Sequence, residues 1–165
     1  MRIFELNTLK DQVKTWKENG EKVVFTNGVF DILHVGHVDY LEKAKNLGTK
    51  LIVAVNDDAS VRRLSKGPER PIHPENARAQ VISALRCVDA AIIFSEDTPL
   101  HLVSELLPSI LVKGGDYDPY ETDENSKKFM VGSKEVRAAG GEVKVIPLVE
   151  GFSTTNAINK IRGQE

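Results

Sequence analysis

Two histidines three positions apart are the residues of this sequence best suited to chemistry. His34 and His37 lie in the segment 26–37, TNGVFDILHVGH, which follows an apolar run. Side chains three apart on a helical turn project to the same side, and imidazole N–H groups near a helix N-terminus can donate to phosphate oxygens. Gly36 leaves room for a ligand to approach the backbone. The pattern indicates phosphate binding, with a purely structural role as the open alternative.

A metal site and the common nucleotide-binding loops fit the sequence less well. Two histidines three apart can be half of a zinc site, but Cys87, His73 and His101 stand alone and supply no further ligand spacing. We therefore predict no protein metal site. The phosphate loop that ends in Gly-Lys-Ser/Thr and the Gly-x-Gly-x-x-Gly fingerprint are both absent from the sequence.

Alternating strands and helices must position these residues. Five short apolar runs have the length and β-branched content of buried strands: 23–26, 51–55, 91–94, 110–112 and 143–146. Apolar residues at helical spacing mark the segments around them: 8–19, 38–44, 77–85, 98–107 and 153–162. The order predicts an α/β fold, a doubly wound (Rossmann-like) parallel five-stranded sheet with helices on both faces. Ligands bind at the carboxyl ends of such strands, where the histidine segment begins.

Two helix starts can be assigned to particular residues. Thr98 and Pro99 have the pattern of an N-cap followed by a first-turn proline. Ser153 is predicted to be the N-cap of the last helix. That helix would bury an apolar stripe that includes Ile158 and Ile161.

Length and composition describe one globular domain, with a lead-in helix within residues 1–21 and the core within 22–162. Lys and Arg number 22 against 24 Asp and Glu, a net charge of −2, so no global positive field would hold a nucleic acid or an anionic membrane. No apolar run reaches the roughly 18 to 20 residues that a membrane-spanning helix needs. The N-terminus lacks the apolar run of a signal peptide, and a single cysteine cannot form an intrachain disulfide. We expect a cytoplasmic protein with no nucleic-acid or membrane partner.

The histidine segment resembles the signature of the His-x-Gly-His nucleotidyltransferase superfamily, in its cytidylyltransferase-like branch. Three further segments follow in the expected order: AVNDD at 54–58, RCVD at 86–89 and EGFSTT at 150–155. Three others look most like the adenylyltransferase domain of ADP-heptose synthases: VKGGDY at 112–117, GSKEV at 132–136 and GGEV at 140–143. The resemblance covers about residues 23–161. With no kinase-sized segment in the sequence, it is closest to the stand-alone form of a domain that many relatives fuse to a sugar kinase.

What the resemblance implies is transfer of AMP from ATP to D-glycero-β-D-manno-heptose 1-phosphate, giving ADP-heptose and pyrophosphate for lipopolysaccharide core synthesis. Catalytic contacts to the triphosphate would come from His34, His37 and Lys66. Nucleotide-binding residues would be Thr26, Asn27, Phe30, Gly36, Arg86, Lys113, Asp116, Gly151, Ser153, Thr154 and Thr155. Further substrate contacts would come from Asp31, Asn56, Arg62 and Arg63. Mg²⁺ would accompany ATP, and a homodimer is common in similar enzymes.

One departure from the family pattern leaves the choice of base open. Leu148 stands where the cytidylyltransferases carry an arginine. The first alternative is therefore a cytidylyltransferase that acts on glycerol 3-phosphate or another alditol phosphate. A nucleotide-binding regulatory domain without chemistry is a second alternative, which the intact histidines, Lys66 and residues 153–155 oppose. The polar stretch 114–132 is expected to form a loop or a closing lid.

Overall fold

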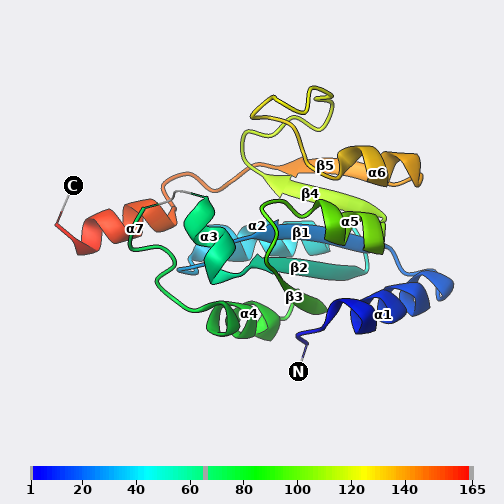
Figure 1. Cartoon of the computed structure of the whole chain (residues 1–165), viewed down its shortest axis with the longest axis horizontal. Helices are drawn as coiled ribbons and strands as arrows, with labels where there is room; N and C mark the ends of the chain where they lie inside the picture. The colour runs from blue at the N-terminus through cyan, green and yellow to red at the C-terminus, as the bar shows by residue number, and fades with distance from the viewer. Residues whose placement is uncertain (1, 65–66, 164–165) are drawn as a thin grey trace.

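The computed structural model of the chain describes residues 2–64 and 67–163. Its helices are α1 (Leu6–Glu18), α2 (Val35–Lys45), α3 (Asp58–Arg63), α4 (Glu75–Ala84), α5 (Leu100–Leu106), α6 (Ser133–Ala138) and α7 (Thr154–Ile161). The strands are β1 (Val23–Gly28), β2 (Lys50–Asn56), β3 (Ala90–Phe94), β4 (Ile110–Gly114) and β5 (Glu142–Ile146). Figure 1 shows how they alternate around one central sheet.

The five strands form one parallel sheet in the order β3-β2-β1-β4-β5. The chain runs from β1 outward to β3, then crosses back to place β4 on the other side of β1. The ladder between β1 and β4 has only two residue pairs, Val24 with Ile110 and Phe25 with Leu111. The carboxyl ends of these two strands are thus not paired with each other at the point where the strand order reverses, which is where doubly wound sheets bind ligands.

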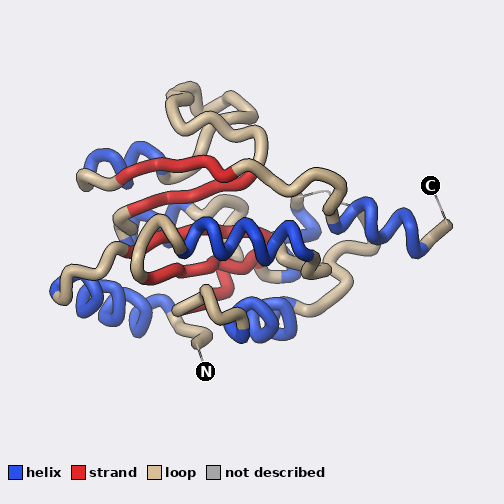
Figure 2. The backbone as a smooth tube through the Cα atoms, turned by 180° about the vertical axis from the view of Figure 1, so that it is seen from behind, coloured by secondary structure: helices blue, strands red, loops and turns tan. Residues whose placement is uncertain are grey.

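Each face of the sheet is covered by helices, because successive strand residues point to opposite faces. On one face, Phe25 packs in a core with residues of α1 and α5, such as Leu9 and Leu102. On the other, Val24 packs in a second core with Leu41 of α2 and Ile82 of α4. Figure 2 shows α2 lying across this second face. The predicted α/β fold with helices on both faces is confirmed.

Two predicted details of helix ends are wrong. The helix after β3 begins at Leu100, with Pro99 and not Thr98 as its N-cap. The ψ of Pro99 is 8°, outside the helical range, so the helix starts one residue later than predicted. In α7, Ile158 is buried, but Ile161 is 81% exposed. The helix α7 extends away from the rest of the molecule toward the C-terminus (Figure 1).

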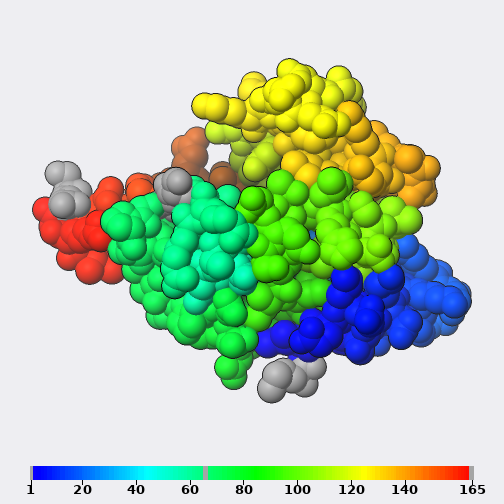
Figure 3. All heavy atoms as spheres, viewed as in Figure 1, coloured from blue at the N-terminus to red at the C-terminus, as the bar shows by residue number. Residues whose placement is uncertain are grey.

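Residues 115–132 form a loop of turns and irregular structure, as expected, above β4 and β5 (Figure 3, yellow). The backbone N–H of Asp118 donates to the carbonyl oxygen of Lys128 at 3.0 Å, which closes the loop on itself. Arg137 of α6 donates to the carbonyl oxygen of Pro119 and so connects the loop to α6. Across the described residues, no helix combines the length and the apolar character needed to cross a membrane.

Candidate active site

A pocket of about 740 Å³ opens at the carboxyl edge of the sheet, where β1 and β4 no longer pair with each other. Ligand pockets commonly measure about 300 to 1,000 Å³, so this one has room for a nucleotide and a small second substrate. The ends of β1, β2 and β4 and the N-termini of α2 and α7 contribute to its walls. Most of the predicted site residues line it: Asn27, Phe30, Asp31, His34, Gly36, His37, Asn56, Lys113, Ser153, Thr154 and Thr155.

Tyr40 forms the floor of this pocket between β1 and β4. Its hydroxyl group hydrogen bonds to Oγ1 of Thr26 at 2.6 Å and donates to the carbonyl oxygen of Val112 at 3.3 Å. Burial raises the pKa of the Tyr40 phenol, so the hydroxyl keeps its proton. Thr26 is fully buried beneath Tyr40 and does not line the pocket. The predicted direct nucleotide contact of Thr26 is therefore replaced by a supporting contact through Tyr40.

The two histidines lie together at the start of α2. Their rings stack with centroids 3.9 Å apart and planes at 27°. A Cβ atom at Gly36 would come within 3.0 Å of Nδ1 of His34, so a glycine is what lets the His34 ring fold back over the helix. Phe30 has a φ of 49°, unusual for a residue with a side chain, and its ring meets the edge of His37 at a centroid distance of 5.5 Å. The loop before α2 is thus bent to hold the histidine pair.

The electrostatic environment of His34 favours the neutral ring in the protein without ligand. Desolvation by burial lowers the pKa of His34 from its ordinary value. Its Nδ1 atom is buried, and no hydrogen-bond partner for it occurs among the described residues. An anionic ligand in the pocket would oppose the effect of burial, because a nearby negative charge favours the imidazolium. The protonation of His34 is therefore expected to depend on what the pocket holds.

Lys113 and Asn27 connect β4 and β1 at the point where the strand order reverses. The ammonium group of Lys113, at the end of β4, donates to Oδ1 of Asn27, at the end of β1. The same ammonium group lies 5.7 Å from the ring centroid of Tyr117. Both residues line the pocket, as the sequence predicted. This places a cationic group and an amide at the point where the strands part, close to the histidine loop.

The N-terminus of α7 closes another side of the pocket. Oγ of Ser153 accepts a hydrogen bond from the backbone N–H of Asn156 at 3.0 Å, which confirms the predicted N-cap. Oγ1 of Thr154 donates to the carbonyl oxygen of Ile32 at 3.4 Å, and the ring of Phe152 lies 6.3 Å from that of His34. These contacts hold the start of α7 against the histidine loop. Two sets of anion-binding donors, ring N–H groups and helix-terminal amides, therefore share one pocket.

Several other predicted residues are held by the protein itself. The carboxylate of Asp31 is buried and accepts hydrogen bonds from Arg70 and from two backbone amides. Nδ2 of Asn56 donates to Oγ of Ser60 at 2.7 Å, although Asn56 lines the pocket. Arg63 donates to Asp97 and to the carbonyl oxygen of Ser95, both at 2.5 Å. Asp31 and Asn56 line the pocket, whereas Arg63 does not.

Six predicted residues among those described do not line the pocket: Thr26, Arg62, Arg63, Arg86, Asp116 and Gly151. Arg62 and Asp116 are exposed to solvent outside it, and Gly151 lies in the turn just before Phe152. Arg86 is exposed before the amino end of β3, whereas the pocket lies at the carboxyl ends of the strands. The prediction that Arg86 reaches the nucleotide in this pocket is not what the structure shows. Lys66 lies outside the described residues.

Three further residues, Arg70, Arg78 and Tyr40, lie in or behind the wall of the pocket. Arg70 lines the pocket and is 6% exposed, and Arg78 is buried with its guanidinium group against the histidine loop. Their partners are 39 and 49 residues away in the chain, and nothing local marks such pairs. Tyr40, three residues after His37, does carry a signal, since helical spacing puts it on the histidine side of α2.

The described side chains do not form a metal cage. Among them, no three His, Cys, Asp or Glu residues come together as a group that could hold a metal ion. The two carboxylates that line the pocket are ion-paired, Asp31 with Arg70 and Asp97 with Arg63.

The parallel sheet, the pocket where its strand order reverses and the histidine pair at the start of α2 are the arrangement expected from the family that the sequence resembles. The chain belongs to the cytidylyltransferase-like family, whose family model matches residues 25–160.

Relatives named bifunctional protein HldE are similar to nearly the whole chain. The one from Edwardsiella ictaluri (strain 93-146) is 56% identical over 160 residues, and the one from Proteus mirabilis (strain HI4320) is 52% identical over 160 residues. Each match covers 97% of this chain and 32% of the relative, so the chain spans about a third of the length of these relatives.

Two solved structures share the fold. The lipopolysaccharide core biosynthesis protein from Thermoplasma volcanium has a TM-score of 0.60 and 34% identity over 81% of this chain and 100% of that one. Pantothenate synthetase from Thermus thermophilus has a TM-score of 0.58 at 19% identity, over 99% of this chain and 70% of that one, and shows the fold alone.

Proposed function

We propose that the protein is an adenylyltransferase that transfers AMP from ATP to a sugar 1-phosphate, D-glycero-β-D-manno-heptose 1-phosphate, and releases pyrophosphate. The observation that carries the proposal is the single pocket shared by the stacked His34 and His37 and the capped start of α7. The heptose substrate is supported by the segments that resemble ADP-heptose synthases and by the similarity to proteins named HldE. A cytoplasmic location, where ATP is available, belongs to the same proposal.

The reaction needs positioning and charge neutralisation rather than a protein nucleophile. A phosphate oxygen of the sugar 1-phosphate attacks the α-phosphorus of ATP, a new phosphorus–oxygen bond forms, and the bond to the β-phosphate breaks with its electrons going to pyrophosphate. In this proposal, His34 and His37 donate to the oxygens that gain charge in the transition state. The amides at the start of α7 bind the phosphates of the nucleotide. Lys113 neutralises charge from the β4 side, and Lys66 is proposed as a further cation from the family resemblance.

Mg²⁺ enters this proposal as part of the substrate. The described residues offer no cluster of carboxylates or imidazoles that would hold the ion on its own. Mg²⁺ commonly binds through phosphate oxygens and water with few protein ligands. We therefore propose that the protein binds ATP as its magnesium complex and orients it through the phosphates.

Pyrophosphate release tests the proposal. The protein would be incubated with Mg²⁺ and either ATP or CTP, each with heptose 1-phosphate or glycerol 3-phosphate, and the nucleotide product would be identified by mass spectrometry. We expect turnover with ATP and heptose 1-phosphate and formation of ADP-heptose. Turnover only with CTP and glycerol 3-phosphate would assign the alternative activity, and nucleotide binding without turnover in any combination would assign a regulatory domain.

Two measurements on the purified protein complete the test. Stoichiometric zinc or nickel in the protein as isolated would contradict phosphate binding by the histidines, because the same rings would then be metal ligands. Sedimentation would determine whether the homodimer expected from similar enzymes forms.

A further inference from the structure

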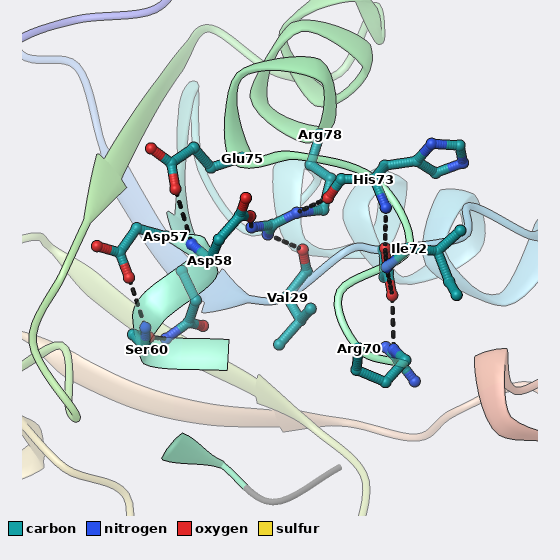
Figure 4. A network of polar contacts seen from close by, with 11 residues as sticks. Val29, Asp57, Asp58, Ser60, Arg70, Ile72, His73, Glu75 and Arg78 are labelled. Carbon is teal, nitrogen blue, oxygen red and sulfur yellow. Dashed lines mark hydrogen bonds and ion pairs between the residues drawn. The ribbon is translucent and has the colours of Figure 1, made fainter. Parts of the chain in front are cut away.

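A buried network of charged groups lies behind the histidine loop. Its central member is Arg78 of α4, whose side chain is fully buried. The guanidinium group donates to the carbonyl oxygen of Val29 at 2.7 Å, to that of His73 at 2.9 Å and to Oδ1 of Asp58 at 2.7 Å (Figure 4). One side chain therefore connects the loop after β1, the start of α3 and the segment before α4.

Asp31 makes the second connection. Its carboxylate accepts from Nε of Arg70 at 2.5 Å and from the backbone N–H groups of Ile72 and His73 at 2.9 Å. Burial alone would raise the pKa of the Asp31 carboxyl, but the amides of His73 and Ile72 and the Arg70 guanidinium outweigh burial and hold that pKa below its ordinary value. All of these donors come from residues 70–73, far from Asp31 in sequence. The carboxylate therefore joins the histidine loop to the segment that leads into α4.

The place of Asp31 in the chain connects this network to the histidines. Asp31 directly follows Phe30, the residue with a positive φ whose ring contacts His37, and it comes three residues before His34. Burying a carboxylate and a guanidinium is costly unless every donor and acceptor is used, and apolar side chains would fill the same space without that cost. What the charged groups add is direction, since they hold the carbonyl oxygen of Val29 and the carboxylate of Asp31, on either side of Phe30.

We propose that Asp31, together with Arg70 and Arg78, positions the His34–His37 pair and makes no contact with the substrate. The inference rests on the proposed function, because it assigns these residues to the same reaction. The network holds the loop from Val29 to His34 in the bent form that stacks the two rings. Loss of a member lets the loop relax, and the rings then leave the geometry needed for phosphoryl transfer. Displacements of about 1 Å at such sites can lower rates by about a hundredfold.

The side chain of Arg70 lines the pocket, so it could act either by positioning the histidine loop or by touching the substrate. Substitution of Arg70 distinguishes these two roles. We would compare Asp31→Asn, Arg70→Gln and the double variant by kcat and by KM for ATP. If Arg70 positions the loop through Asp31, each variant lowers kcat by about tenfold to a hundredfold, KM for ATP stays nearly unchanged, and the double variant is no slower than the slower single one. If Arg70 binds phosphate directly, Arg70→Gln raises KM and its effect multiplies with that of Asp31→Asn, which would overturn the proposal.

Asp89→Asn is the matched control for loss of an ion pair. Asp89 accepts from Lys45 at 2.5 Å and from the backbone N–H of Leu51 at 2.7 Å, at the amino end of β2 and away from the pocket. This variant should lose stability without a fall in kcat. Should Asp31→Asn fail to fold, Arg70→Gln still leaves the amide hydrogen bonds to Asp31 and carries the test alone.

Histidine side-chain NMR signals supply a readout that does not depend on activity. We expect the signals of His34 and His37 to shift in Asp31→Asn and Arg70→Gln and to stay in place in Asp89→Asn. Unshifted signals in the first two variants would overturn the positioning role. If the wild-type protein shows no adenylyl transfer to heptose 1-phosphate while the signals shift as expected, the proposed function fails and the positioning of the histidine pair stands.

Discussion

The imidazole ring of His34 lies almost face to face with that of His37, with centroids 3.9 Å apart and planes at 27°. Burial in this stack lowers the pKa of His34, and its Nδ1 atom is buried with no hydrogen-bond partner among the described residues. Under the proposed function, a bound polyphosphate would place negative charge beside His34 and favour its protonated form. The charge of His34 is therefore expected to change when the ligand binds.

Removal of the His37 ring tests its proposed role as a donor to the transition state. His37→Ala should lower kcat by about a hundredfold or more, because a donor to the transition-state charge is lost. Its melting temperature should change little, since His37 is only half-buried. His101→Ala, on the exposed surface of α5, is the control and should keep the wild-type rate. An unchanged kcat in His37→Ala would remove His37 from the mechanism.

Strand alternation explains which residues the sequence predicts correctly near the pocket. Asn27 and Lys113 follow apolar runs, and the carboxyl ends of parallel strands lie at one edge of the sheet, so their placement could be predicted. Thr26 precedes Asn27 and points to the opposite face, beneath Tyr40. Family resemblance alone could not reveal that the hydroxyl of Thr26 is covered.

Contacts between residues that are distant in the sequence could not be predicted from local patterns. The position of Asp31 in the histidine segment predicts substrate binding, but its acceptors are used by Arg70 and residues 72–73. The motif around Arg86 predicts a nucleotide contact, yet Arg86 lies before β3, at the amino edge of the sheet. The pairing of a carboxylate with an arginine 39 residues away depends on the packed fold and has no local signature.

Proton uptake should accompany nucleotide binding. Burial lowers the pKa of His34 in the free protein, whereas bound phosphate favours its protonated form, so the pKa rises on binding. ATP affinity should therefore increase as the pH falls through the pKa of the complex, and it should level off below the lower pKa of the free protein. Calorimetry at about pH 6 and about pH 8, in buffers of different ionisation enthalpy, measures this uptake.

His34→Gln should abolish most of the proton uptake, and His101→Gln should leave it intact. Net proton release on ATP binding to the wild-type protein would contradict a protonated His34 in the complex.

Leu148 is expected to influence the choice of base. It lines the pocket and is 56% exposed, and its side chain packs against the backbone of Gly114 and Gly115. A guanidinium group there would present donors to the carbonyl oxygen and ring nitrogen of a pyrimidine. Leu148→Arg should therefore lower kcat/KM for ATP relative to CTP, with pyrophosphate release as the measurement. Leu148→Met keeps the apolar contact and should keep the wild-type preference. If the ratio of kcat/KM for ATP to kcat/KM for CTP is the same in both variants, Leu148 does not determine the choice of base.

Ser153 combines two roles that substitution can separate. Its hydroxyl oxygen caps α7 by accepting from the backbone N–H of Asn156, and Ser153 also lines the pocket. Ser153→Ala should lower the free energy of unfolding by about 1 kcal/mol through loss of the cap. Aspartate is as good an N-cap as serine and suits the positive end of the helix, so Ser153→Asp should keep the stability. Its carboxylate would nevertheless stand where phosphate is proposed to bind and should raise KM for ATP by roughly tenfold or more. Thermal unfolding and steady-state kinetics on both variants make the comparison, and a Ser153→Asp protein with wild-type KM would limit Ser153 to capping.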